Sequence, residues 1–507
     1  MSATALAPSG SPQDASESER LRNVHPLAWQ NPTPHGRYHL LVIGAGTAGL
    51  VAAHAAAALG AKVALIERQW LGGDCLNVGC VPSKAILRSA RLYAEMRSAK
   101  HYGVQAPAEV SVDFAAAMAR MRSIRARISR ADSVARLVAA GVEVFFGAAE
   151  FNGRDSVTVA GTTLHFKKAL IASGAGPETP DIPGLVDAGF LTNENIFDLT
   201  EPPRRLLVIG GGPLGCELAQ AFARFGCQCT IVQKLPLFLP KEERDAAQLL
   251  ADALAADGIE VRLNTEAMAV TVKAGAKHVD LRSDDYQSTV VVDAILVGTG
   301  RVPNVAGLGL SAAGVTFDAE RGIHVNDFLQ SSNRHIYAAG DVCLPHKFTH
   351  TADASARIVV RNALFMGRQR LSALTIPWCT YTDPEIAHVG LYVRQANDQK
   401  IQVRTFTIPL HEVDRAIADG EETGFVKIHI RAGSDRILGA TVVARHAGEM
   451  INEITLAMVA GIGLGKLSSV IHAYPTQAEA IKKAADAYQR TRLTPWLRAW
   501  LRRWLAW

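Results

Sequence analysis

Residues 39–49 read HLLVIGAGTAG, and this stretch decides the fold of the first part of the chain. The apolar run His39–Ile43 predicts a short buried strand, and the glycine-rich loop 44–49 leads into an alanine-rich helix that ends near Leu59. A second strand, Ala61–Ile66, follows and ends at Glu67. Together these elements form the fingerprint of a dinucleotide-binding unit. We expect a pyrophosphate at the helix N-terminus and a ribose diol on the Glu67 carboxylate.

The same pattern returns later in the chain. Arg205–Ile209 predicts a strand, the loop 210–215 reads GGGPLG, a helix runs to about Phe225, and Cys227–Val232 predicts the next strand. One glycine loop alone is weak evidence, but two complete units predict two dinucleotide sites. The glycines expected to let the backbone approach these dinucleotides are Gly44, Gly46, Gly49, Gly210, Gly212 and Gly215.

Three further apolar runs end in glycine-rich turns. One run ends at Ser173 and Gly174, a second at Gly300 and Arg301, and the third, residues 336–341, ends at Gly340 and Asp341. An acid at the end of such a strand can reach the ribitol or phosphate part of a dinucleotide.

Two cysteines stand close together in GGDCLNVGCVPSK, residues 72–84, directly after the first dinucleotide unit. Cys75 and Cys80 at this spacing can alternate between a dithiol and a disulfide. An inert bridge is the alternative, but structural disulfides are rare in cytosolic proteins. Zinc would need a shorter spacing and further cysteines or histidines nearby, so we expect no resident metal ion.

The composition is that of an ordinary globular protein, with 48% hydrophobic and 20% charged residues. Residues 1–37 lack the apolar core of a secretory signal and predict a disordered leader, which favours a cytoplasmic location. Residues 489–507 hold five arginines and no acid, which accounts for the whole net charge of +5. The rest of the chain is therefore neutral, and nothing indicates nucleic-acid binding.

From about Pro377 the pattern changes to that of a separate α+β domain. Val426–Ile430 and Ile437–Ala444 predict strands, and Glu449–Met458 and Gln477–Tyr488 predict helices. The tail 495–507, read as a helix, carries Trp and Leu on one half and Arg on the other. This pattern is typical of an interfacial membrane helix, although the same tail could also pack on its own dimer.

With GGDCLNVGCVPSK, two glycine fingerprints, GTGRVPN, AAGD and HAYPTQAE in this order, the chain resembles the class I pyridine nucleotide–disulfide oxidoreductases, most of all the mercuric reductase-like branch. The resemblance implies an α/β fold with two Rossmann-like domains, which bind FAD and NAD(P)H, and a C-terminal α+β dimerisation domain. It also implies a homodimer. The implied boundaries are 38–190 and 308–373 for FAD, 191–307 for NAD(P), 374–488 for dimerisation and 489–507 for the tail.

The resemblance also implies roles for single residues. Cys80 would lie against the flavin and Cys75 would attack the acceptor, with the site lowering the pKa values of the thiols. Lys84 would lie near flavin N5 and pair with Glu217, since a cation there stabilises electron density on a reduced flavin. Electrons would pass from NAD(P)H through FAD to the cysteine pair, and on to a disulfide, a metal ion or another small acceptor.

The chain departs from the family pattern at one position. Disulfide reductases carry a histidine directly before Pro-Thr, but this chain has Tyr474, while Glu479 is kept and His472 lies two residues upstream. A phenol with a pKa near 10 is a poor base, which counts against dihydrolipoamide or glutathione turnover and fits mercuric reductases, in which this position is tyrosine. Tyr474 could instead serve only in packing at the dimer interface. One feature counts against Hg(II) as the acceptor. Mercuric reductases also use a C-terminal pair of cysteines and often a cysteine-containing leader, whereas this chain has no cysteine after Cys379 and none before Cys75.

The sequence favours one coenzyme and leaves two alternative functions open. The second fingerprint strand ends in Gln233-Lys234 rather than in an acid, which favours NADPH over NADH. The first alternative function is a dihydrolipoamide dehydrogenase that uses His472 as the base. The second is a flavin-bound redox sensor or membrane-recruited binding protein with little turnover.

Overall fold

The computed structural model describes residues 14–105, 111–284 and 286–506. By its internal contacts the chain divides into two compact units. The first unit holds residues 1–210, 221–229 and 267–374, and the second holds residues 211–220, 230–266 and 375–507.

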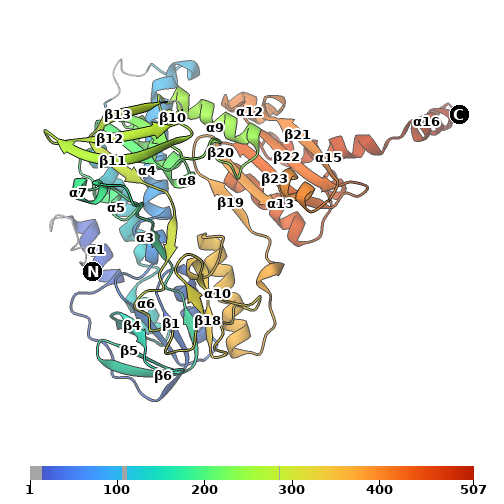
Figure 1. Cartoon of the computed structure of the whole chain (residues 1–507). Coiled ribbons are helices and arrows are strands. Elements are labelled where there is room, and N and C mark those ends of the chain that lie inside the picture. Colours follow the sequence, from blue (N-terminus) through green and yellow to red (C-terminus); the bar gives the residue numbers. More distant parts are fainter. Residues whose placement is uncertain (1–13, 106–110, 285, 507) are drawn as a thin grey trace. The chain divides into compact units, whose positions relative to one another are not determined.

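A seven-stranded sheet forms the centre of the first unit (Figure 1). Its parallel part runs in the order β3-β2-β1-β6, with β18 on the far side of β6, and an antiparallel pair, β5-β4, also follows β6. β2 is buried throughout and β1 from Leu40 onward, so both read as apolar runs, whereas β6 is continuously buried only at its end, residues 169–171. The strands are β1 (Arg37–Ile43), β2 (Val63–Glu67), β3 (Val142–Phe146), β4 (Ala149–Phe151), β5 (Ser156–Val159), β6 (Thr162–Ile171) and β18 (Ile336–Ala338).

Helices α2 (Thr47–Ala58) and α10 (Thr349–Leu364) pack closely against each other on this sheet. Alanines at the contact allow a close approach, among them Ala48, Ala52 and Ala352, which share one buried core with β1 and β2. The predicted first strand, helix and second strand are therefore confirmed as β1, α2 and β2.

The second fingerprint also folds as predicted, within one or two residues at each end. In the first unit β8 (Arg205–Ile209) pairs in parallel with β14 (Ala294–Val297). In the second unit β9 (Gln228–Val232) pairs in parallel with β10 (Glu260–Arg262) through residues 230–232. Helix α8 (Pro213–Arg224) follows the glycine loop.

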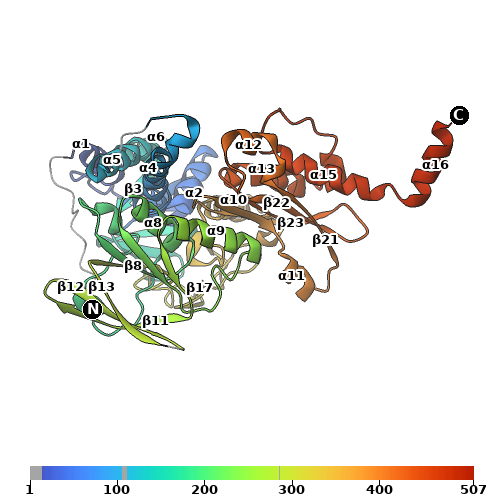
Figure 2. The ribbon, with the colours of Figure 1, turned by 90° about the horizontal axis from the view of Figure 1, so that it is seen from above.

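The second unit contains an antiparallel five-stranded sheet in the order β19-β20-β23-β22-β21. Helix α13 (Ala447–Val459) packs on β20 and β23, and α15 (Glu479–Arg492) packs on β21 and β22 (Figure 2). The predicted α+β domain is confirmed, and the two strands and two helices predicted for it correspond to β22, β23, α13 and α15. The strands are β19 (Pro377–Thr380), β20 (Glu385–Gly390), β21 (Val403–Pro409), β22 (Phe425–Arg431) and β23 (Ile437–Ala444).

The prediction of a disordered leader is wrong for the part of it that the structure describes. Ala15–Val24 form helix α1, whose N-cap Asp14 accepts hydrogen bonds from the backbone N–H groups of Ser16 and Glu17. The polar composition was misleading because buried ion pairs, rather than apolar residues alone, hold this helix. Residues 1–13 lie outside the described residues.

Candidate active site

A cavity of about 590 Å³ lies in the first unit where the parallel strands end. Gly44 follows β1, Glu67 ends β2, Ala172 follows β6 and Ala339 follows β18, and all four line the cavity. Ligands of open α/β sheets bind at this edge. The predicted cofactor and redox residues that line it are Gly44, Gly46, Glu67, Cys75, Cys80, Ser173, Gly174, Arg301, Gly340 and Asp341.

Two glycines of the first turn have no room for a side chain, and the third leaves its backbone open to the cavity. Gly44 has φ +97°, and a Cβ there would lie 2.4 Å from the carbonyl oxygen of Ala172. A Cβ at Gly49 would lie 1.8 Å from the oxygen of Gly44, so Gly49 allows α2 to pack closely on β1. Gly46 meets only Gly73 Cα, at 3.7 Å, which leaves its backbone open to the cavity.

The carboxylate of Glu67 is buried at the end of β2. Its Oε2 accepts a hydrogen bond from the N–H of Ala45 at 2.7 Å, and its Oε1 accepts one from Gln69 at 2.8 Å. Burial raises the pKa of Glu67, and these backbone N–H groups oppose that shift. The carboxylate thus stands at the cavity wall beside the glycine turn, as a ribose-binding acid should.

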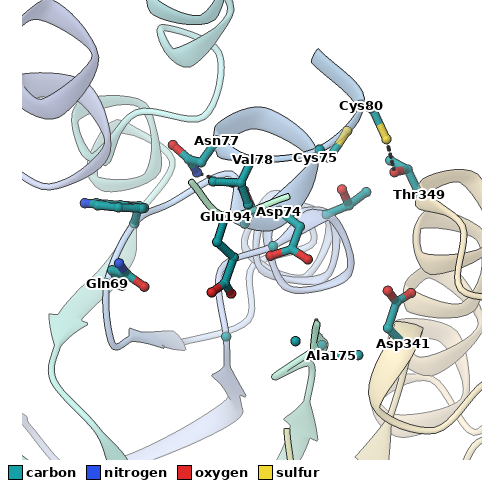
Figure 3. A pocket seen from close by; sticks show the side chains of 18 of the residues that line it. Gln69, Asp74, Cys75, Asn77, Val78, Cys80, Ala175, Glu194, Asp341 and Thr349 are labelled. Atoms are coloured by element: carbon teal, nitrogen blue, oxygen red, sulfur yellow. Dashed lines mark hydrogen bonds between the residues drawn. The ribbon is translucent and has the colours of Figure 1, made fainter. Parts of the chain in front are cut away.

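The two cysteines lie at one wall of the cavity, and both are thiols in this structure (Figure 3). Cys75 lies in α3 (Gly73–Asn77), and Cys80 is the first residue of α4 (Cys80–Ser98). The Sγ of Cys80 is 3.4 Å from Oγ1 of Thr349, the first residue of α10. Cys80 therefore stands at the N-termini of two long helices, whose partial positive charge favours a thiolate.

The pKa of Cys75 is raised, which corrects the expectation that the site lowers it. The main cause is a hydrogen bond with the Cys80 thiol, followed by burial of Cys75. In the dithiol form Cys75 thus keeps its proton while Cys80 occupies the position that favours negative charge. For Cys75 to act as a thiolate, a base or a cation must displace this proton.

An acidic cluster around one arginine lies at the same cavity. The Arg301 guanidinium forms an ion pair with Asp74, and its Nε lies 3.6 Å from Oδ2 of Asp341. Burial raises the pKa of Asp341 and of Glu194, and the nearby charge of Asp74 adds to both shifts. Lys347 donates a hydrogen bond to the Arg301 carbonyl at 2.9 Å.

Sequence reasoning found Arg301 and Asp341 in this cluster but missed the other members. Asp74 stands inside the quoted cysteine motif and could have been singled out as an acid beside a predicted pyrophosphate. Glu194, Lys347 and Thr349 lie in stretches without a periodic or motif signal, and the fold alone brings them to the cavity.

Ser173 and Gly174 interlock with the turn after β14. The Ser173 hydroxyl donates to the carbonyl of Asn304 at 2.8 Å, and the Asn304 amide donates to the carbonyl of Ser173 at 2.8 Å. The glycine-rich turns that follow β6 and β14, which have similar sequences, are therefore hydrogen-bonded to each other.

In the second unit, Tyr474 is 71% exposed, and its hydroxyl donates to Oδ2 of Asp414 at 2.9 Å. This hydrogen bond to a carboxylate raises the pKa of Tyr474. His472 does not share that environment. Its Nε2 lies 3.0 Å from Oε1 of Glu453, its Nδ1 lies 3.4 Å from the Val470 carbonyl, and its side chain is 7% exposed. The Oε2 atom of Glu479 is buried without a hydrogen-bond partner.

The second glycine turn repeats the geometry of the first. Gly210 has φ +111°, and a Cβ there would lie 2.5 Å from the Gly298 oxygen, whereas Gly212 has open space. Oε1 of Gln233 accepts the N–H of Gly211 at 3.0 Å, and Lys234 pairs with Glu266 at 3.0 Å. Glu217 accepts the N–H of Tyr381 at 2.9 Å. The roles predicted for Gly215, Gly300, and the Lys84–Glu217 pair stay predictions.

The residues at the cavity fit FAD. The open backbone at Gly46 and the N-terminus of α2 suit a pyrophosphate, the buried Glu67 suits a ribose, and the cysteine pair lies at the same cavity. The fold and the site thus define a two-dinucleotide protein with a redox-active cysteine pair.

The comparisons with known proteins name the class. The model of the pyridine nucleotide-disulphide oxidoreductase family matches residues 38–357, and the model of that family's dimerisation domain matches residues 376–485. The chain therefore belongs to the pyridine nucleotide-disulphide oxidoreductases, as its motifs predict. It is a flavoprotein disulfide oxidoreductase of an FAD-dependent family that uses NAD(P)H, and its matched dimerisation domain indicates a homodimer.

Relatives of two activities resemble the chain about equally. It is 32% identical to a mercuric reductase of Staphylococcus aureus over 90% of this chain and 83% of the relative. It is 35% identical to a dihydrolipoyl dehydrogenase of Thermus scotoductus over 89% of this chain and 98% of the relative. Among solved structures, the Cu(II) complex of the HOCl-induced flavoprotein disulfide reductase RclA from Escherichia coli matches with a TM-score of 0.79 at 28% identity, covering 89% of this chain and 100% of that one.

Proposed function

We propose that this enzyme carries two electrons from NADPH through the Cys75–Cys80 pair to a thiophilic metal ion. FAD, when bound, supplies the two-electron carrier between the nicotinamide and the cysteine pair. The hydride and one further proton convert the disulfide into two thiols. The thiols then lose two electrons and two protons as the disulfide forms again, which reduces one divalent ion by two electrons or two Cu(II) ions to Cu(I).

The observation that carries this proposal is the state of the two groups that would manage the acceptor's proton. The pKa of Cys75 is raised, and Tyr474 is hydrogen-bonded to Asp414 with a raised pKa of its own. A disulfide acceptor needs a base to remove the Cys75 proton. A coordinating metal cation deprotonates a thiol by itself, so a metal acceptor does not depend on a base at position 474.

Steady-state oxidation of NADPH with Cu(II), Hg(II), oxidised glutathione, lipoamide and a quinone tests the acceptor class. We expect turnover with at least one metal ion that is abolished in Cys75→Ser and exceeds the rate without enzyme. Turnover of lipoamide or glutathione more than tenfold above that of either metal ion would contradict the proposal.

A dihydrolipoamide dehydrogenase is the second candidate, favoured by the Thermus scotoductus relative. It would require His472 to act as the base. Both ring nitrogens of His472 face oxygen acceptors, and its side chain is 7% exposed, which argues against that role. His472→Gln distinguishes the two, since it should leave metal-ion turnover unchanged and would abolish lipoamide turnover if His472 were the base.

For the coenzyme we propose NADPH. No acid stands at the end of the second fingerprint strand, since Gln233 is there and its side chain caps the glycine turn. The exposed Lys234 stands next to it, paired with Glu266, and can exchange this partner for a 2′-phosphate. We expect kcat/KM to favour NADPH, and Lys234→Ala to reduce that preference about tenfold, whereas Lys241→Ala, an exposed control, leaves it unchanged. A tenfold preference of the wild type for NADH would contradict the assignment.

We also propose that the tail holds this cytoplasmic enzyme at a membrane surface. Helix α16 (Pro495–Leu505) has no buried residue, and Trp496, Trp500 and Trp504 are all more than half exposed on the side opposite the arginines. None of the described helices is long and apolar enough to cross a membrane. The full chain should pellet with vesicles rich in anionic lipid, and a chain that ends at Tyr488 should not. Equal pelleting would contradict this contact.

A further inference from the structure

Helix α1 (Ala15–Val24) lies beside α5 (Phe114–Ser129), as both Figure 1 and Figure 2 show. The two helices are joined at the cap of α1, where the Asp14 carboxylate forms an ion pair with Arg122. Asp14, Glu17 and Arg20 line the same cavity as Cys75 and Cys80. The segment before the first strand therefore forms part of the wall of the redox cavity.

Between α1 and α5 lies a buried group of charges. Glu17 accepts hydrogen bonds from Nε of Arg20 at 3.0 Å and from Nη2 of Arg125 at 2.9 Å. Arg20 is 3% exposed and Arg125 is 4% exposed. Burial alone would raise the pKa of Glu17, but its bonds and charge interactions with the two arginines lower it overall. Glu17 is therefore the anion that holds both guanidinium groups in place.

Both arginines also bind the short helix that carries Cys75. Arg20 donates from Nη1 to the side-chain oxygen of Asn77, and Arg125 donates from Nη1 to its carbonyl at 2.8 Å. Asn77 in turn donates to the carbonyls of Leu71 and Gly73 at 2.9 Å each. Asn77 is the last residue of α3, stands between the two cysteines and is 2% exposed (Figure 3).

Further contacts join α1 and its C-cap to residues 69–71, which precede the cysteine motif. The carbonyl of Val24 accepts the N–H of Leu71 at 3.1 Å. The ring of His25 is hydrogen-bonded to the carbonyl of Gln69. The Arg20 guanidinium lies 4.9 Å from the centroid of the Trp70 ring. Helix α1 and its C-cap His25 thus contact the segment before the cysteines at residues 69–71 and again at Asn77.

Buried guanidinium groups are costly unless each is paired and hydrogen-bonded. Here the two guanidinium groups have both Glu17 and Asn77 as partners only when α1 and the segment between the cysteines are both in position. We propose that α1 is a positioning element for the redox pair, in which Arg20, held by Glu17, fixes Asn77 and so fixes Cys75 against Cys80. This inference rests on the proposed redox function of that pair.

Arg20→Gln in the full-length FAD-loaded enzyme tests it, with Arg22→Gln as the matched control. Arg22 lies on the same helix but is exposed, so the Arg22→Gln substitution removes the same charge without changing a contact to the segment between the cysteines. After anaerobic reduction, the alkylation rate of Cys75 by iodoacetamide is followed by peptide mass spectrometry. The long-wavelength charge-transfer absorbance per bound FAD is recorded alongside.

We expect Arg20→Gln to raise the alkylation rate of Cys75 about tenfold, the size set by one lost hydrogen bond to a charged group, and to weaken the absorbance band. Arg22→Gln should match the wild type. Arg20→Lys should fall between them, since a lysine keeps the charge without the fork of donors.

A double-mutant cycle with Asn77→Ser separates positioning from a general loss of stability. If Arg20 acts through Asn77, the effects of the two changes on the alkylation rate are not additive. Additive effects, or an Arg20→Gln rate equal to that of Arg22→Gln, would overturn the proposal. The alkylation rate is independent of the absorbance band, so a wild type without the band counts against the redox function and leaves this test decisive.

Discussion

At the residue scale, the proposed choice of a metal ion as acceptor depends on a few protons. Cys80 stands at two helix N-termini, Cys75 keeps its proton, and Tyr474 is bound to Asp414. The sequence identified both cysteines and the tyrosine, because each stands in a motif with fixed spacing. It could not identify Asp414 or Thr349 as their partners, since these contacts join segments far apart in the chain.

Tyr474→His should convert the enzyme towards disulfide chemistry. An imidazole has a pKa near 6.5 and can accept the thiol proton, and the unpartnered Oε2 of Glu479 is available to orient it. We expect kcat/KM with lipoamide to rise about 100-fold, the lower end of the contribution of a general base. Tyr474→Phe is the control, and a rise of the same size in that variant would exclude proton transfer as the cause.

His388 makes the stability of the second unit sensitive to acid. Burial lowers its pKa to about 3, and its ring accepts from Thr441 or donates to it at 2.8 Å, and faces the Gly390 carbonyl at 3.1 Å. Below pH 6.5 His388 takes up a proton in the unfolded chain but not in the folded one. The contribution of His388 to the free energy of unfolding is therefore complete above pH 6.5 and is lost as the pH falls towards 3.

His388→Gln should flatten that dependence, because glutamine keeps a donor and an acceptor but does not titrate. Urea unfolding at pH 6.5, 5.5 and 4.5 can be followed by tryptophan fluorescence, to which Trp378, 4.6 Å from the His388 ring, contributes. The wild type should lose up to about 1.4 kcal/mol per pH unit more than the variant. Parallel curves for His388→Gln and wild type would contradict the assignment, and exposed His411→Gln serves as the control.

At the element scale, the strand, turn and helix of each fingerprint follow from local sequence. Glycine was required at Gly44 for two reasons, a positive φ and a carbonyl 2.4 Å from where a Cβ would be. Helix α1 shows the limit of this reasoning. Its sequence is polar, and the burial of Glu17 and Arg20 against Arg125 and Asn77, which the sequence does not reveal, helps to explain why it is ordered.

Gly44→Ala should lose FAD, because the new methyl group would push the turn away from β6. Gly60→Ala is a matched control, since Gly60 also has a positive φ, +82°, but has open space around its Cβ. We expect Gly60→Ala to cost about 1 kcal/mol of stability and to keep its flavin. The ratio of flavin to protein absorbance measures the outcome, and equal flavin content in the two variants would contradict the steric argument.

At the scale of the whole molecule, the order of motifs predicted the family. The change of pattern near Pro377 predicted a separate α+β domain, and the model of the family's dimerisation domain matches it at residues 376–485. The acceptor was not predictable in the same way. In the proposed function it depends on the protonation of Cys75 and on what surrounds Tyr474, both of which arise from tertiary contacts. Exposed apolar residues of the second unit, such as Leu456, Val459 and Ile471, suit the interface of a homodimer.

In the proposed function a flavin lies against Cys80 and exchanges electrons with it. Anaerobic titration of the purified homodimer with dithionite tests this most directly, because it needs neither the coenzyme nor the acceptor. We expect the first two electrons per subunit to reduce the disulfide and to produce a thiolate–flavin charge-transfer band, which Cys75→Ser retains and Cys80→Ser lacks. A colourless protein, or a Cys80→Ser spectrum identical to that of the wild type throughout reduction, would contradict it.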